Sequence, residues 1–211
     1  MAARRTLNLA VGLGMGLHLL ALPPAMAGAP RPADAVVPLS NGPNLIPLTA
    51  AGLPAQAFLA HRDNANAHGF DVLTLYIQAP TWPGSPPRWQ LVPVFDPRDE
   101  QRLHLSNGEH LTLTVSGGAD CRLHDFRLLA PANGDNARLV IADRELGDSF
   151  ASAAPVTFRF FKFANNTEGL PGRPVYYFEF DRAQRAARPY CDVGDALRTE
   201  LGLGPYEAAR P

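Results

Sequence analysis

The sequence is poor in lysine, cysteine and net charge. Lys162 is the one lysine among 19 basic residues of the 211-residue chain, and only 18% of all residues are charged. The formal net charge is -1, so the chain lacks the basic surface that nucleic acid or an anionic membrane would attract. We therefore expect no nucleic-acid partner. The preference for arginine, alanine and proline is typical of a bacterial protein from a GC-rich genome.

Recognisable catalytic motifs are missing as well. The chain contains no Gly-x-Ser-x-Gly nucleophile elbow, no His-Glu-x-x-His zinc motif, no glycine-rich phosphate loop and no Cys-x-x-Cys pair. Catalytic groups can still converge from separate loops, so this absence disfavours an enzyme without excluding one. The sequence predicts neither a cofactor nor a metal site.

No apolar run is long enough for a permanent membrane span of about 20 residues. Arg4 and Arg5 precede a mostly apolar stretch, residues 9–22, that three glycines and His18 interrupt. Small residues follow in Ala25-Met26-Ala27, as a signal peptidase requires. Residues 1–27 are therefore predicted to be a signal peptide cleaved after Ala27, which places the mature protein in the periplasm or outside the cell.

The two cysteines are Cys121 and Cys191. Cys121 could be a nucleophile beside His124, a metal ligand or half of a disulfide. Export to an oxidising compartment favours the disulfide, which also accounts for Cys191. A bridge across about 70 residues would stabilise the fold by about 4 kcal/mol in the chain-entropy model.

The mature chain is predicted to be all-β, an antiparallel β-sandwich or barrel of about eight to nine strands with a short C-terminal helix. Residues 28–56 form an irregular lead-in, residues 57–211 form a single β-rich domain, and the helix covers residues 192–201. The expected strands are residues 57–61, 71–78, 89–95, 102–106, 110–115, 122–129, 138–142, 156–163 and 174–181.

Local patterns add detail to this prediction. The apolar run 139–142 indicates a strand covered on both faces. The apolar positions of the strand 156–163 change parity between Phe160 and Phe161, which predicts a β-bulge there. Asp192 is placed to cap the helix and Gly202 to end it.

The segment from His61 to Asp71 joins two expected strands and is the most polar short stretch. Its asparagines predict a turn held by side-chain hydrogen bonds rather than a calcium loop, because Leu75 occupies the position of the required bidentate glutamate. Arg62, His61 and His68 offer donors to an anionic ligand. These residues and Asp71 are candidate ligand-binding residues.

Two further candidates are His124 and Arg144. His124 and Asp125 are neighbours on one strand, so they point to opposite faces and cannot act together as base and orienting acid. Asp143, Arg144 and Glu145 close the apolar strand, where charges usually mark its emergence into solvent. The alternative is that Arg144 pairs with a buried carboxylate such as Asp125 and fixes the packing of loops.

Several stretches together, "AHGFDVLTLYI", "SGGADCRLHDF", "LVIADRELGDSF", "PVTFRFF" and "CDVGDALRTELGLGPY", resemble the bacterial periplasmic carbapenem self-resistance (CarG-like) proteins. The similarity covers most of residues 40–206. It implies antibiotic resistance by a route unlike that of a β-lactamase, and the chain agrees in lacking Ser-x-x-Lys, Ser-Asp-Asn, Lys-Thr-Gly and a set of zinc ligands. The resemblance assigns no functional residue.

Two classes of function follow. The first is an exported, non-enzymatic binding or protective protein whose partner is a small molecule such as a β-lactam, or an envelope protein. The second is a secreted or periplasmic hydrolase or metal-dependent enzyme whose His and Asp residues converge from loops. Convergence of His61, His68, His124 and Asp71 in one cleft would favour the enzyme, and their dispersal would favour the binding protein.

Overall fold

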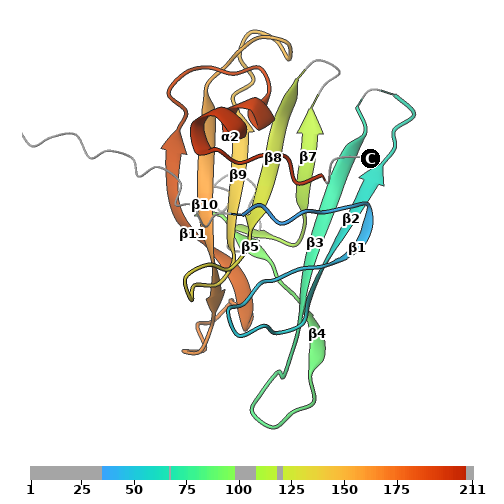
Figure 1. The fold of residues 1–211 in the computed structure, drawn as a ribbon, viewed down its shortest axis with the longest axis vertical. Helices are drawn as coiled ribbons and strands as arrows, with labels where there is room; N and C mark the ends of the chain where they lie inside the picture. Colours follow the sequence, from blue (N-terminus) through green and yellow to red (C-terminus); the bar gives the residue numbers. More distant parts are fainter. Residues whose placement is uncertain (1–34, 67, 98–107, 118–120, 208–211) are drawn as a thin grey trace, which may run out of the picture.

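A computed structural model of the protein describes residues 35–66, 68–97, 108–117 and 121–207. The all-β class and the short C-terminal helix are confirmed (Figure 1). The predicted signal peptide, residues 1–27, and the expected strand 102–106 lie outside the described residues. Within them, no helix has the length and hydropathy that crossing a bilayer would require.

The described residues form eleven strands in one sheet, mostly antiparallel, with one helix. The order of neighbouring strands is β1-β2-β3-β7-β8-β9-β10-β11-β5-β6, and β4 also pairs with β3. The bounds are β1 Gly42–Leu45, β2 Ala55–Arg62, β3 Phe70–Ala79, β4 Arg88–Leu91, β5 Val94–Phe95, β6 Glu109–His110, β7 Leu113–Gly117, β8 Arg122–Leu129, β9 Arg138–Arg144, β10 Val156–Asn165, β11 Tyr176–Arg185 and α2 Val193–Leu201.

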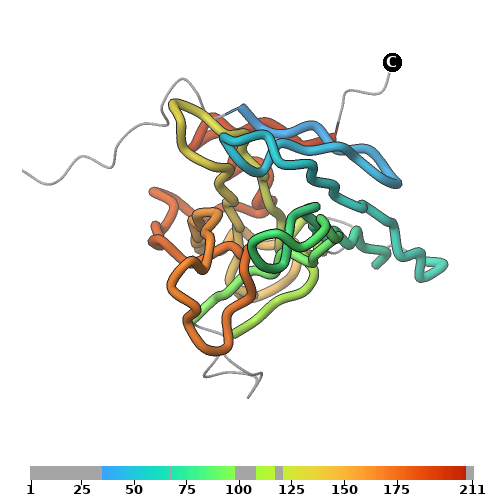
Figure 2. Tube along the Cα trace, turned by 90° about the horizontal axis from the view of Figure 1, so that it is seen from below, coloured from blue at the N-terminus to red at the C-terminus, as the bar shows by residue number. Residues whose placement is uncertain are grey.

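The sheet curls around one core instead of closing into a barrel (Figures 1 and 2). The segment 88–95 draws its two sides together, because β4 pairs with β3 and the adjoining β5 pairs with β11 in parallel. Leu75 of β3 and Phe178 of β11 therefore belong to the same buried cluster. This arrangement accounts for the sandwich-like alternation of the sequence.

Strand β9 is covered on both faces, as its continuous apolar run predicts. Leu139 and Ile141 face the core inside the curl, whereas Val140 and Ala142 face a second cluster. Helix α2 supplies Val193 and Leu197 to that second cluster. The helix therefore lies on the outer side of β8 and β9, across the upper part of the sheet in Figure 1.

The lead-in is more ordered than the sequence indicates. Residues 42–45 form the edge strand β1 on β2, and β2 begins at Ala55, inside the expected lead-in. Val37, Leu39, Ile46 and Leu48 are buried in the main core. The segment therefore belongs to the folded domain, since its apolar side chains pack into the core that the curled sheet encloses.

The predicted irregularity at Phe160 and Phe161 is confirmed, but the extra residue lies on the partner strand. Phe160 pairs with Arg182 and Phe161 with Phe180, so Asp181 of β11 is unpaired. Pairing of β10 with β9 is regular throughout. The parity of the apolar residues changes because β10 is buried on its outer face at Phe158 and on its inner face at Phe161.

Helix α2 begins and ends where the sequence predicts. Asp192 is the N-cap and accepts a hydrogen bond from the backbone N–H of Gly194 at 2.6 Å. Gly202 ends the helix in the left-handed conformation, with φ 68°. A disulfide joins Cys121 and Cys191, whose Cα atoms are 5.5 Å apart, so the start of the helix is fixed to the start of β8.

Candidate functional site

His61 and Asp71 lie opposite each other on β2 and β3. The Nδ1 atom of His61 is 2.8 Å from Oδ1 of Asp71, and the hydroxyl of Tyr206 donates to Oδ2 at 3.2 Å. A Cβ atom added to Gly69 would come within 2.7 Å of Nε2 of His61. The imidazole is thus held between a carboxylate and a close glycine backbone, while 55% of its side chain remains exposed.

Arg62 and His68 are adjacent to this pair but have other contacts. The guanidinium of Arg62 lies over the ring of Phe70, 5.1 Å from its centroid. His68 belongs to a turn in which its backbone N–H donates to Asn66 Oδ1 at 2.9 Å, and its carbonyl accepts from Asn64 at 2.7 Å. The predicted Asx-type turn is therefore present.

His124 belongs to a second polar group on three adjacent strands. Its Nδ1 atom is 2.5 Å from Oδ1 of Asp143 on β9. Nε of Arg159, on β10, donates to Oδ2 of the same carboxylate at 2.9 Å. Arg159 also pairs with Asp96, which follows β5 and is completely buried. From the interior outward, the group therefore consists of the carboxylate of Asp96, the guanidinium of Arg159, the carboxylate of Asp143 and the partly exposed imidazole of His124.

Burial lowers the pKa of Arg159 to about 10. The guanidinium is still charged at neutral pH, and the two carboxylates on either side compensate that charge inside the protein. Sequence reasoning missed Asp96 and Arg159. The contact exists because β5 lies in parallel beside β11, which lies beside β10, and no local pattern encodes that neighbourhood.

Ser116 of β7 is the register partner of His124, beside a bulge between Ser116 and Gly117. Asp143 is the partner of His124 on its other side. Serine, histidine and aspartate thus follow one another across β7, β8 and β9. A catalytic triad is defined by a contact from serine to histidine and a contact from histidine to aspartate. This row shows the second, between His124 and Asp143.

Asp125 points to the opposite face from His124, as alternation predicts. Its carboxylate accepts from Arg122 at 2.9 Å and pairs with Arg127 at 2.8 Å. Arg127 also donates to the carbonyl of Gly204 and lies over the ring of Tyr206. Because all of these groups connect β8 to the C-terminal segment, Asp125 has a structural role.

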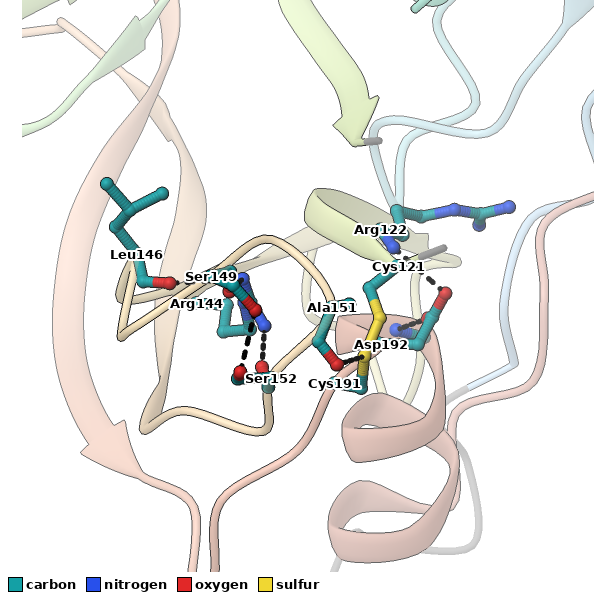
Figure 3. The surroundings of a disulfide bond; sticks show 10 residues. Cys121, Arg122, Arg144, Leu146, Ser149, Ala151, Ser152, Cys191 and Asp192 are labelled. Carbon is teal, nitrogen blue, oxygen red and sulfur yellow. Dashed lines mark hydrogen bonds between the residues drawn. A yellow bond between two sulfur atoms is a disulfide. The ribbon is translucent and has the colours of Figure 1, made fainter. Parts of the chain in front are cut away.

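The expected pairing of Arg144 with Asp125 is wrong, although Arg144 does organise a loop (Figure 3). Its guanidinium donates to the carbonyls of Leu146 at 3.2 Å and Ser149 at 3.1 Å, and also to that of Ser152. Arg144 lies on the same face as Asp125, whose register partner is Ala142, but Asp125 is paired with Arg122 and Arg127, and the guanidinium of Arg144 is directed toward its own following loop. That loop approaches the disulfide, where the carbonyl of Ala151 lies 3.1 Å from Sγ of Cys191.

The candidate residues thus form separate groups. His61 pairs with Asp71 and His124 with Asp143, whereas His68 and Arg144 serve their own loops. In the parts of the chain that the structure describes, no group of three or more His, Cys, Asp or Glu side chains is arranged to hold a metal ion. The arrangement provides exposed donors at the end of the β2–β3 hairpin and a partly exposed imidazole on β8.

Comparison with known proteins supports the fold. No family model matches the chain, and no curated protein matches it either. A solved structure described as "Crystal structure of CarG" is similar, with a TM-score of 0.60 and 24% sequence identity. The match covers 78% of this chain and 94% of that chain. At this identity the similarity establishes a shared, CarG-like fold.

Proposed function

We propose that the protein is exported by way of residues 1–27 and acts in the periplasm as a non-enzymatic binding or protective protein, with carbapenem self-resistance as its specific role. The observation that carries this proposal is that His61 and His124 each pair with a different aspartate. A hydrolytic centre would need these groups around one reacting atom. The CarG-like fold and the disulfide are consistent with such a role.

The ligand donors in this proposal are at the end of the β2–β3 hairpin. His61, Arg62 and His68 are exposed there, and Asp71 orients the imidazole of His61. Such a set would bind the carboxylate of a β-lactam, or an acidic segment of an envelope protein, through charge-assisted hydrogen bonds. His124 would offer a second contact point, whereas the donors of Arg144 are directed to loop carbonyls.

Expression in a carbapenem-sensitive bacterium tests the proposal. The full-length chain should raise the carbapenem concentration that the cells survive, and a chain without residues 1–27 should not. Joint replacement of Cys121 and Cys191 by serine should reduce protection, because the bridge contributes about 4 kcal/mol to stability. Equal protection by the chain without its leader would contradict a periplasmic site of action.

The row of Ser116, His124 and Asp143 is a specific observation in favour of a hydrolase. In that second candidate function His124 would be the base, Asp143 its orienting acid and Ser116 the nucleophile. Arg159 argues against it, because its cation already neutralises Asp143. A serine-directed fluorophosphonate separates the two functions, since labelling of Ser116 that Ser116→Ala and His124→Ala both abolish would establish the hydrolase.

A further inference from the structure

The outer face of strands β1 to β4 carries large apolar side chains. Alternate residues of β2 and β3, such as Leu59 and Leu75, are buried in the core, so the residues between them point to the opposite side. On that side Phe58 is 48% exposed, Trp89 is 46% exposed and the edge residue Leu45 is 84% exposed. Among the described residues, no element packs over this face.

Three aromatic residues form a diagonal row on this face. Phe58 on β2 pairs with Thr74, Tyr76 on β3 pairs with Leu91, and Trp89 on β4 pairs with Gln78. Each step of the row crosses one strand and advances two residues, which corresponds to about 7–8 Å. The three rings therefore span about 15 Å, a length that suits an extended chain molecule.

Neutral hydrogen-bonding groups accompany each ring. Thr74 lies beside Phe58, Gln56 beside Tyr76, and Gln78 beside Trp89. The strand residues of this face include one charged side chain, Arg62, which lies at the end and covers Phe70. An exposed sheet face usually carries alternating charges, so a neutral aromatic face of this kind marks a binding surface.

The size and charge of the face limit what could bind to it. Four strands spaced about 4.8 Å apart, at about 3.3 Å per residue, provide about 400 Å². A stable protein complex buries about 800 Å² on each partner, and binding to an anionic membrane requires several basic residues. The face instead matches a sugar, which has an apolar ring face and equatorial hydroxyls. The C–H groups of the sugar would stack on the aromatic rings, and its hydroxyls would meet the neighbouring amide and hydroxyl side chains.

We propose that the row of Phe58, Tyr76 and Trp89 binds a neutral linear glycan, whose pyranose rings stack on the aromatic side chains while Gln56, Thr74 and Gln78 hydrogen-bond to its hydroxyl or acetamido groups. This site is independent of the protective role proposed above. It lies on the outer face of the sheet, whereas the polar groups around His124 and Arg159 lie on the inner face.

Tryptophan fluorescence provides a direct test, because Trp82 and Trp89 are the two tryptophans of the chain. Titration of the mature protein with a chito-oligosaccharide should change the emission saturably. Trp89→Ala, measured by calorimetry, should weaken the affinity at least about tenfold, equivalent to about 1.4 kcal/mol. Gln78→Ala should also weaken it, whereas the exposed Phe150, in the loop near the disulfide, provides the matched control Phe150→Ala, which should leave it unchanged.

Two results would overturn the proposal. One is the absence of saturable binding by both a chito-oligosaccharide and a cello-oligosaccharide. The other is self-association of the protein, observed by sedimentation and lost in Trp89→Ala, because the face would then be an interface between copies of the chain. A folded Trp89→Ala, judged by an unchanged circular dichroism spectrum, excludes misfolding as the cause of lost binding.

Discussion

At the scale of single residues, Arg159 is the centre of the buried polar group. It is 5% exposed and lies between the carboxylates of Asp96 and Asp143. Removal of one partner of a buried ion pair leaves the other charge uncompensated in a poorly polarisable interior. The arrangement therefore makes the charge of Arg159 necessary for the stability of the folded protein.

We expect Arg159→Met to lower the free energy of unfolding by about 3–5 kcal/mol, because it leaves Asp96 buried without this cation. The matched control is Arg185→Met. Arg185 pairs with Glu145 on the surface, and its loss should cost less than about 1 kcal/mol. Urea denaturation of both variants measures the difference. Equal losses of unfolding free energy would show that the buried pair contributes no more to stability than the surface pair.

Tyr206 predicts a pH dependence of stability. Burial raises the pKa of its phenol above the ordinary 10.0, and the carboxylates of Asp71 and Asp125 raise it further. Above about pH 10 the unfolded chain releases this proton while the folded protein retains it. Since a raised pKa in the folded state stabilises the fold below the unfolded pKa, this contribution is lost as the pH rises past 10.

We expect Tyr206→Phe to lower the free energy of unfolding by about 1 kcal/mol at pH 7, because the hydrogen bond to Asp71 is lost. The deficit relative to the natural protein should narrow as the pH increases from about 9 to about 11, because the phenylalanine variant has no proton to release. Denaturation at several pH values measures this trend. A deficit that grows with pH would contradict the assigned direction.

Residue pairing was partly predictable from the sequence. Alternation along β8 correctly separates His124 from Asp125, since it depends only on the local backbone. The partners of these residues depend on which strands are adjacent. His124 contacts Asp143 because β9 follows β8 in an antiparallel pair, whereas the contact between Arg159 and Asp96 requires the non-local pairing of β5 with β11.

At the scale of elements, the start of α2 is attached to β8 twice. The disulfide joins Cys121 to Cys191. The residues that follow the two cysteines are linked as well, because Asp192 Oδ2 accepts a hydrogen bond from the backbone N–H of Arg122 at 3.1 Å. The other oxygen of Asp192 caps the helix. One carboxylate therefore satisfies donors of two elements.

Asp192→Ala should cost about 2 kcal/mol, about 1 for the lost cap and about 1 for the lost hydrogen bond to β8. Asp195→Ala is the control in the same helical turn. Asp195 is exposed and pairs with Arg198, so its loss should cost at most about 0.5 kcal/mol. Thermal unfolding of the two oxidised variants distinguishes them, and an equal effect would mean that the connection to β8 is not stabilising.

The sequence predicts these elements unequally well. The bounds of α2 follow from Asp192 and Gly202, whose roles are local. The irregularity near Phe160 was located correctly, yet the unpaired residue is Asp181 on β11, because the apolar pattern of β10 reports which faces are buried and not which strand has the additional residue. Strand β1 was missed because its four residues, Gly42–Leu45, carry no alternating pattern.

At the scale of the whole molecule, a curled sheet separates two environments. The inner side holds the main core and, near one end, the polar group of His124 and Arg159. The outer side holds α2 over β8 and β9, and the aromatic row on β2 to β4. The all-β class was predictable from the number of short alternating segments. The curl was not, because it depends on the segment 88–95 pairing with both β3 and β11.

The binding role proposed above has a consequence for the whole molecule. His61 and His124, proposed above as ligand contacts, are each held by a different aspartate. If the mature protein protects by binding, as proposed, its effect on a β-lactam is stoichiometric.

The most direct test incubates the purified mature protein, residues 28–211, with an excess of a carbapenem and follows intact drug and bound drug together. The proposed binding role predicts at most one drug molecule bound per protein and no accumulation of hydrolysed product above the protein concentration, in the natural protein and in His124→Ala alike. Many turnovers per protein molecule that His124→Ala abolishes would contradict it, and would assign the row of Ser116, His124 and Asp143 to catalysis.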